Sequence, residues 1–246
     1  MTDVPIYQAL IFDMDGLMID SERLYWEVEK GIARSHGREV REETLWKMMG
    51  RRPIEGMRIF VEEVGLPVPA DEALALRDRR MREKYRNESE AMPGLFSILD
   101  AFSGRLKLAV CTGAQAEFME IVLDRLKIRE KFDVLQASDG IEKGKPDPEI
   151  YLKTCVRLGL APRQCIVLED SSNGCLAGKS AGCYAIAVPS DYSRGQDFGC
   201  ADHVASGLPD AEKHILGLLQ ERLVTRYSQI TWLCHNQRKT RHRGGV

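Results

Sequence analysis

Carboxylate side chains occur in two places where their spacing could support chemistry. Asp13 and Asp15 follow one short apolar segment, and Glu169 and Asp170 follow another. Residues two apart in extended backbone point to the same side, so Asp13 and Asp15 face together. Any one of these acids alone is more simply explained as the cap of a turn or helix. If the two segments are neighbouring strands, however, up to four carboxylates share one region.

Such a cluster requires a cation, because two unit charges about 4 Å apart repel by roughly 4 kcal/mol at an effective dielectric constant of about 20. Ligation by carboxylate oxygens, with water completing an octahedron, favours Mg²⁺. We therefore predict Mg²⁺ as the cofactor. The cysteines and histidines show no spacing typical of a structural zinc site.

The sequence also offers groups that bind phosphate. Thr112 follows the apolar segment Leu106–Cys111 and supplies a hydroxyl, while Gly113 and Ala114 supply backbone N–H groups at the start of a predicted helix, where anions are favoured. Lys145 supplies a compact positive charge. Taken singly, Thr112 is a helix cap and Lys145 a surface lysine. Together with the acid cluster they predict a phosphoryl-transfer site with a carboxylate nucleophile.

Four short motifs follow one another in a recognisable order. They are DMDG at 13–16, CTG at 111–113, GKPDP at 144–148 and EDS at 169–171. This order resembles the haloacid dehalogenase superfamily of phosphotransferases, in its subgroup with an α-helical cap, which includes β-phosphoglucomutase and many small-metabolite phosphatases. The segment MDGLMIDSERLY resembles the phosphatase side, including the pseudouridine-5′-phosphatase-like proteins. The resemblance extends over about residues 9–189.

The resemblance implies a role for each matching residue. Asp13 corresponds to the nucleophile that forms an aspartyl-phosphate, and Asp15 to the general acid and base. Thr112 and Lys145 correspond to the phosphate-binding hydroxyl and the charge-balancing lysine. Ser21, where the chain enters the predicted cap, is a further candidate for phosphate contact.

The implied metal ligands all offer oxygen atoms: Asp13, the backbone carbonyl of Asp15, Asp170, and Glu169 directly or through water. In the predicted cap, Arg51 and Arg52 are candidates for contact with the substrate, and two surface arginines are the alternative. Mutase relatives usually carry a lysine before the glycine of this loop, whereas this chain has Met49. This difference favours a phosphatase over a mutase.

Bringing these residues together requires a sheet whose strands end at one edge. After Pro93-Gly94, the pattern predicts strands at 106–111, 132–137, 165–168 and 184–188, and helices at 116–126, 148–158 and 173–181. This alternation implies βαβ units and a parallel sheet covered on both faces. An all-helical block separates a first strand at 7–12 from the others. We therefore predict an α/β fold, with a Rossmann-like parallel sheet and an inserted all-helical cap.

The predicted domains are an α/β core (residues 1–19 and 93–224), a helical cap (20–92) and a basic C-terminal tail (225–246). The predicted function is Mg²⁺-dependent hydrolysis of a small phosphorylated metabolite, either a sugar phosphate or a nucleoside monophosphate, through an aspartyl-phosphate. The alternatives are a sugar-phosphate mutase and a non-enzymatic phosphate-accepting module such as a receiver domain. A receiver domain needs no helical block of this length, which argues against that alternative.

The composition is that of a globular protein. Hydrophobic residues make up 43% and the formal net charge is −2, which excludes a disordered chain and a dedicated nucleic-acid binder. The basic tail contains no acid, and we interpret it as a solvated end rather than an RNA site. No apolar run reaches membrane-spanning length. The seven cysteines form no CxxC pair, which indicates reduced thiols. We expect a cytoplasmic monomer whose partner is a small phosphorylated metabolite.

Overall fold

The computed structural model describes residues 7–49, 51 and 53–220 of the 246-residue chain. Its centre is a six-stranded sheet with the order β3-β2-β1-β4-β5-β6, in which every neighbouring pair is parallel. The strands are β1 (Ala9–Phe12), β2 (Lys107–Cys111), β3 (Val134–Gln136), β4 (Cys165–Glu169), β5 (Tyr184–Ala187) and β6 (His203–Val204). The predicted α/β class with a Rossmann-like parallel sheet is confirmed.

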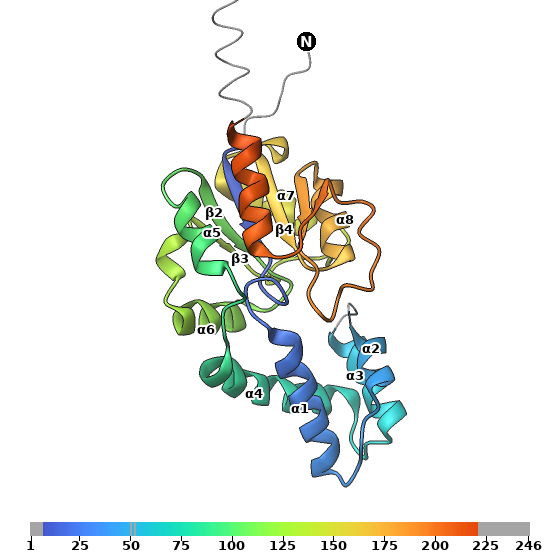
Figure 1. Cartoon of the computed structure of the whole chain (residues 1–246). Helices are drawn as coiled ribbons and strands as arrows, with labels where there is room; N and C mark the ends of the chain where they lie inside the picture. The colour runs from blue at the N-terminus through green and yellow to red at the C-terminus, as the bar shows by residue number, and fades with distance from the viewer. Residues whose placement is uncertain (1–6, 50, 52, 221–246) are drawn as a thin grey trace, which may run out of the picture.

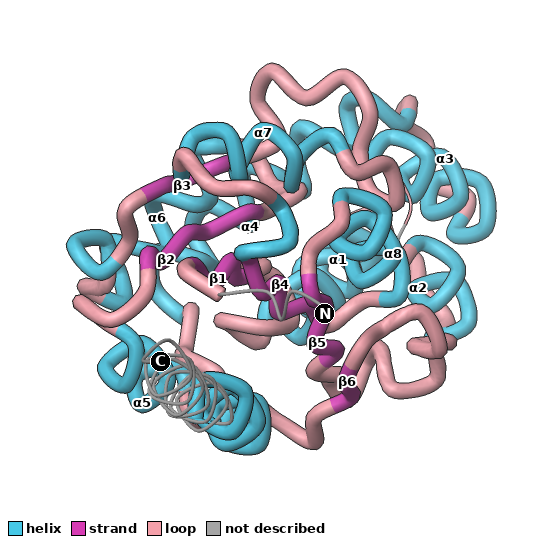
Figure 2. Tube along the Cα trace, turned by 90° about the horizontal axis from the view of Figure 1, so that it is seen from above, coloured by secondary structure: helices cyan, strands magenta, loops and turns pink. Residues whose placement is uncertain are grey.

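Helices cover both faces of the sheet (Figure 2). They are α5 (Leu95–Phe102), α6 (Ala116–Leu126), α7 (Glu149–Leu158) and α8 (Ser172–Ala181), with 3₁₀ turns at Arg129–Lys131 and Pro162–Gln164 and a further helix over 208–220. Alternate strand residues point to opposite faces. Leu10 and Phe12 therefore pack in one hydrophobic core with α5 and α6, whereas Ala9 and Ile11 pack in another with α7 and α8. Burial on both faces explains why the strands are apolar throughout.

A helical insert lies between β1 and α5, at the end of the sheet where β1 finishes (Figure 1). It consists of α1 (Ser21–Ser35), α2 (Glu42–Met48), α3 (Pro53–Val64) and α4 (Ala70–Glu88). Leu24, Val28 and Ile32 recur at helical spacing and are buried. Pro53 begins α3, where its missing N–H costs no hydrogen bond. The described residues of the insert contain no strand, as predicted.

The chain enters and leaves this insert through two adjacent segments. Ile19 forms a bridge with Ala91, and the Met92 N–H donates to the Met18 carbonyl at 2.9 Å. The two connections therefore lie side by side, close to the end of β1. This arrangement places the base of the insert next to the residues that follow β1.

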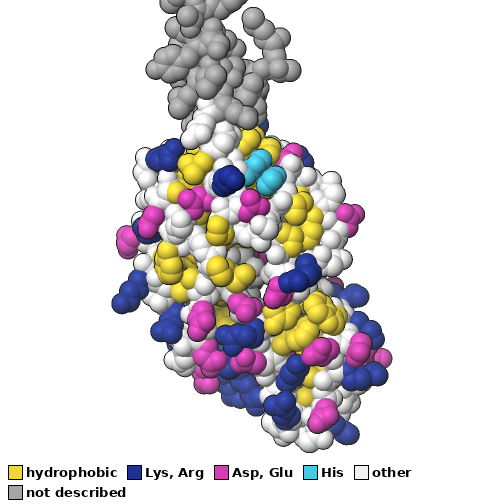
Figure 3. All heavy atoms as spheres, viewed as in Figure 1, with side chains coloured by type: hydrophobic (Ala, Val, Ile, Leu, Met, Phe, Trp, Pro, Cys, Tyr) yellow, Lys and Arg dark blue, Asp and Glu magenta, His cyan; other side chains and the backbone are white. Residues whose placement is uncertain are grey.

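Aromatic side chains join the insert to the core at a second place. The Trp26 ring lies 5.0 Å from that of Trp46 and 5.1 Å from that of Tyr192, which belongs to the loop after β5. Figure 3 shows hydrophobic side chains gathered on the surface where the insert meets the core. Edge-to-face aromatic pairs contribute about 0.5–1.5 kcal/mol each, so the Trp26–Tyr192 pair favours contact between the two parts.

The observed elements differ from the predicted ones mainly at their ends. The strand predicted at 132–137 is limited to Val134–Gln136, because the side chain of Asp133 accepts a hydrogen bond from the Leu108 N–H. Helix α5 and strand β6 were not predicted. Helix α5 follows Gly94, which has no polar side chain to mark the start of a helix. Strand β6 has two residues, which is too short for a strand pattern in the sequence. Among the described residues, no helix has both the length and the apolarity needed to cross a membrane.

Candidate active site

The two predicted acid pairs meet at one edge of the sheet. Strands β1 and β4 are neighbours, with Phe12 opposite Leu168, so the residues that follow both strands share the same edge. Oxygen atoms of Asp13, Glu169 and Asp170 lie within 4.8 Å of one another, and all three side chains are buried. The convergence that the sequence only suggested is therefore present in the structure.

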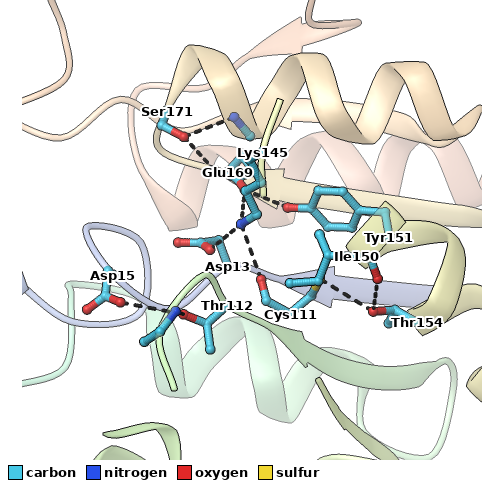
Figure 4. Close-up of polar contacts among 12 residues, drawn as sticks. Asp13, Asp15, Cys111, Thr112, Lys145, Ile150, Tyr151, Thr154, Glu169 and Ser171 are labelled. Carbon is cyan, nitrogen blue, oxygen red and sulfur yellow. Dashed lines mark hydrogen bonds and ion pairs between the residues drawn. The ribbon is translucent and has the colours of Figure 1, made fainter. Parts of the chain in front are cut away.

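Lys145 reaches this cluster from the loop between β3 and α7 (Figure 4). Its Nζ lies 2.6 Å from Asp13 Oδ1 and 2.5 Å from Glu169 Oε1, and it donates to the Cys111 carbonyl at 3.3 Å. Burial alone would lower the pKa of the ammonium group, but the charges of Asp13 and Glu169 outweigh it and hold that pKa well above its ordinary value. Lys145 is therefore a buried, permanently charged partner of the acids.

Glu169 is held by two further hydroxyls that the sequence analysis missed. Tyr151 on α7 donates to Glu169 Oε1 at 2.5 Å, and Ser171 donates to Oε2 at 3.0 Å. Ser171 also accepts from the Gly174 N–H at 3.1 Å and so caps α8. Ser171 was visible as the last letter of the EDS motif. Tyr151 occupies an apolar helical position and carried no signal.

Asp15 lies beside the cluster, with hydroxyl groups next to both carboxylate oxygens. Tyr85 on α4 donates to Oδ1 at 2.6 Å, and Thr112 Oγ1 lies 3.5 Å from Oδ2. Burial raises the pKa of Asp15, although the Tyr85 hydrogen bond opposes the shift. Ser21, at the first turn of α1, is fully buried, and its hydroxyl, like that of Tyr85, opposes the rise in the pKa of Asp15. Tyr85 is a further residue that the sequence analysis did not find.

The predicted anion site at Thr112 differs in detail from expectation. Helix α6 begins at Ala116 with Gln115 as its N-cap, so Gly113 and Ala114 lie in the preceding turn. The Ala114 N–H donates to Thr112 Oγ1 at 3.0 Å and is already paired. A short threonine side chain two residues before this N–H competes for it, which sequence spacing did not reveal. Gly113 borders open space.

Of the two arginines predicted to contact the substrate, only Arg51 lies among the described residues. Arg51 is exposed, and its Nε donates to the Lys47 carbonyl at 2.7 Å, so its guanidinium is held at the end of α2. Arg52 lies outside the described residues, as does the basic tail at 225–246. The prediction that Arg51 contacts a substrate therefore has no support from its hydrogen bonding.

The acid cluster has the features of a cation site. Lys145 supplies one positive charge against the carboxylates of Asp13, Glu169 and Asp170. Asp170 has no hydrogen-bond partner among the described residues, and burial together with Asp13 and Glu169 raises its pKa well above the ordinary value. Gly16, with φ +76°, lets the backbone approach Asp170 so closely that a Cβ would lie 2.7 Å from Cγ. Oxygen donors in this arrangement fit Mg²⁺.

Comparison with known proteins agrees with this geometry. Residues 10–188 match the family model described as haloacid dehalogenase-like hydrolase. A phosphorylated carbohydrates phosphatase of Thermotoga maritima is 39% identical over 180 residues, covering 71% of this chain and 82% of that protein. A probable pseudouridine-5′-phosphatase of Drosophila melanogaster is 30% identical over 217 residues, covering 85% and 93%.

A solved structure shares the fold of this chain. The crystal structure of CbbY from Rhodobacter sphaeroides in complex with phosphate superposes with a TM-score of 0.74 at 25% identity, covering 82% of this chain and 95% of that chain. The family model spans more than half of the chain, and the sequence relatives bear the names of phosphatases. This protein belongs to the haloacid dehalogenase-like hydrolases, the family that the order of its motifs predicted.

Proposed function

We propose that this protein is a Mg²⁺-dependent phosphatase that hydrolyses a small phosphorylated metabolite, a sugar phosphate or a nucleoside monophosphate, through an aspartyl-phosphate on Asp13. The observation that carries this proposal is the position of Asp13. Its carboxylate lies in a buried cluster with Glu169 and Asp170, and one of its oxygens is paired with Lys145 at 2.6 Å. Water is excluded from the buried Asp13 carboxylate, and the fixed charge of Lys145 beside it attracts a phosphate dianion to this position.

The first step transfers the phosphoryl group to Asp13. Lys145 engages Asp13 Oδ1, which leaves Oδ2 free of that ion pair to form the new O–P bond. The ester P–O bond breaks as Asp15 gives its proton to the leaving oxygen. The raised pKa of Asp15 favours the protonated form that this step needs.

The second step hydrolyses the aspartyl-phosphate. Asp15, now a carboxylate, removes a proton from water as that water attacks phosphorus and releases Asp13. Mg²⁺ would be held by Asp13, Asp170 and the Asp15 carbonyl, and it supplies positive charge against the phosphoryl oxygens. Both oxygens of Glu169 already accept hydrogen bonds from protein groups, so a bridging water suits Glu169 better than direct ligation.

The helical insert would act as the cap that covers this site. Helices α1 to α4 lie over the edge of the sheet where Asp13 and Asp15 are found, and both connecting segments are adjacent to that edge. A cap in this position excludes water during the first step. The corresponding division is a core of residues 1–19 and 93–224 and a cap of residues 20–92.

A panel of phosphate esters tests the proposal. Purified protein with Mg²⁺ should release phosphate from one or more sugar phosphates or nucleoside monophosphates, and Asp13→Asn should remove that activity. A folded protein that releases no phosphate from any ester would refute it. Phosphorus NMR of the same reactions would reveal a mutase, which moves phosphate within the sugar without releasing it. Stable phosphorylation without turnover would instead indicate a phosphate-accepting signalling module.

A further inference from the structure

A tyrosine of the helical insert contacts the proposed acid and base. Tyr85 lies on α4, its side chain is fully buried, and its hydroxyl donates to Asp15 Oδ1 at 2.6 Å. Seventy residues separate the two in sequence. The partner on the other oxygen, Thr112 Oγ1, lies 3.5 Å from Oδ2, which is the outer limit for a hydrogen bond. The two oxygens of Asp15 are therefore held very differently.

Packing fixes the Tyr85 ring independently of its hydroxyl. The ring makes edge-to-face contacts with Tyr25 of α1 at 6.3 Å and with Phe118 of α6 at 5.6 Å between centroids. One turn earlier on α4, Arg82 pairs with Glu117 at 2.8 Å across the same junction. Tyr85 thus sits where the insert meets the core. Removing its hydroxyl should leave the ring in place.

This contact favours one oxygen of Asp15 over the other as the carrier of the proton. A neutral carboxylic acid has one hydroxyl oxygen and one acceptor oxygen. The Tyr85 hydroxyl lies 2.6 Å from Oδ1, whereas Thr112 Oγ1 lies 3.5 Å from Oδ2, so the shorter contact favours Oδ1 as the acceptor and Oδ2 as the oxygen that carries the proton of the neutral acid. A freely rotating carboxyl would instead divide its proton between the two positions.

We propose that Tyr85 is a positioning residue, which holds Asp15 so that Oδ2 presents the proton to the leaving oxygen of the substrate. The inference rests on the proposed role of Asp15 as general acid. In the first step the Asp13 O–P bond forms, the ester P–O bond breaks, and the Oδ2 proton passes to the departing oxygen, which leaves as an alcohol. Asp15 becomes a carboxylate, and the Tyr85 hydrogen bond stabilises the charge that has developed.

The same contact links proton transfer to the position of the insert. Tyr85 belongs to the insert and Asp15 to the core, so the hydrogen bond exists only while α4 lies against the core near α6. If the insert moves away, Asp15 loses its orienting partner. Asp15 is therefore oriented to protonate the leaving group only when the insert covers the site. When the site is open to solvent, Asp15 lacks this orientation.

Tyr85→Phe tests the inference, because phenylalanine keeps the packing and removes only the hydroxyl. The measurement is kcat/KM with Mg²⁺ for glycerol phosphate, whose alkoxide needs a proton, and for p-nitrophenyl phosphate, whose leaving group does not. Since kcat/KM reports steps through the first irreversible one, it isolates alcohol release. We expect about a 10-fold loss for the alkyl ester, which is smaller than the 10²- to 10⁴-fold typical of losing general acid catalysis altogether because Asp15 itself remains, and less than about 2-fold for the aryl ester.

Two further variants separate the possible outcomes. Tyr184→Phe removes a hydroxyl that contacts His214 at 3.0 Å, away from the site, and should change neither ester. Asp15→Asn should show the same preference for the aryl ester as Tyr85→Phe, but more strongly. Equal losses on both esters in Tyr85→Phe, or no loss, would overturn the positioning role. If Asp15→Asn itself affects both esters equally, the proposed general acid is wrong and the inference falls with it.

Discussion

Alanine at Gly16 should disable the proposed metal site, an effect separate from the backbone strain that any left-handed alanine introduces. Gly16 has a φ of +76° in the turn after Asp15, and a Cβ there would lie 2.7 Å from Asp170 Cγ and closer still to Oδ2. Contacts below 3.0 Å are essentially never observed for Cβ atoms, so the Asp170 carboxylate must move. A displacement of about 1 Å in a catalytic group can lower the rate about 100-fold.

Gly37→Ala provides a matched control. Gly37 has a φ of +67°, and a Cβ there would meet nothing within 4 Å. Both substitutions force alanine into the left-handed region, which costs about 1–2 kcal/mol. The two variants should therefore lose similar stability in thermal unfolding without metal, but differ in the contact with Asp170.

The assay is phosphate release at increasing Mg²⁺ concentration, together with thermal unfolding of both variants. We expect Gly16→Ala to lose about 100-fold in kcat/KM and to require more Mg²⁺. Gly37→Ala should keep the kcat/KM and the Mg²⁺ requirement of the unmodified protein, although it loses stability. If Gly16→Ala retains activity within about 3-fold of the control, the Asp170 carboxylate does not need this position, and the reasoning fails.

Three other changes follow from the same geometry. Asp13→Asn should fold normally and lose steady-state turnover, because an amide cannot form the acyl-phosphate; substantial activity in the folded variant would contradict this. A chelator should abolish activity, Mg²⁺ should restore it, and Ca²⁺ should compete with little turnover because of its looser geometry; full activity in chelator would exclude the metal. Replacing Arg51 and Arg52 together by alanine should change substrate ranking in kcat/KM if either arginine contacts the leaving group, and a proportional change for all substrates would assign them to the surface.

The parts of the site that the sequence predicts are those next to strand ends. Asp13, Glu169 and Asp170 follow apolar segments whose parallel pairing brings them to one edge. An alternation of strands and helices is a local pattern, and the rule that parallel strands end together converts it into a spatial prediction. Helix α6 was predicted with its observed bounds, Ala116–Leu126, because its apolar spacing is regular.

The missed residues depend on packing between distant elements. Tyr85 reaches Asp15 across 70 residues, and its place on α4 is a buried position that any large apolar residue could fill. Tyr151 reaches Glu169 from a face of α7 that otherwise packs against the sheet. In both cases the ring explains the sequence pattern and the hydroxyl carries the chemistry. Sequence periodicity detects the buried position of the ring, but it does not show which carboxylate the hydroxyl contacts.

Buried carboxyl groups also predict how stability depends on pH. Burial, partly opposed by Lys145, raises the pKa of Asp13 to about 8, and burial with neighbouring charges raises that of Asp170 well above its ordinary value. The folded protein therefore binds more protons than the unfolded chain between about pH 4 and pH 8. Unfolding free energy falls with rising pH wherever the folded state holds the extra protons.

Without metal, the melting temperature should therefore fall between pH 6 and pH 9. Saturating Mg²⁺ should reduce this fall, because it binds the ionised carboxylates and stabilises the folded state by about 2.7 kcal/mol at 100 times its dissociation constant. Burial also raises the pKa values of Glu22 and Glu29, to about 7 and about 8. These two residues add a similar fall of the melting temperature with rising pH. Asp13→Asn separates the contributions, since it should remove the pH dependence that comes from Asp13 and leave that of Glu22 and Glu29. A melting temperature that is independent of pH without metal, or a Mg²⁺ shift of equal size at pH 6 and pH 9, would show that burial does not raise the pKa values of Asp13 and Asp170 in the absence of a cation.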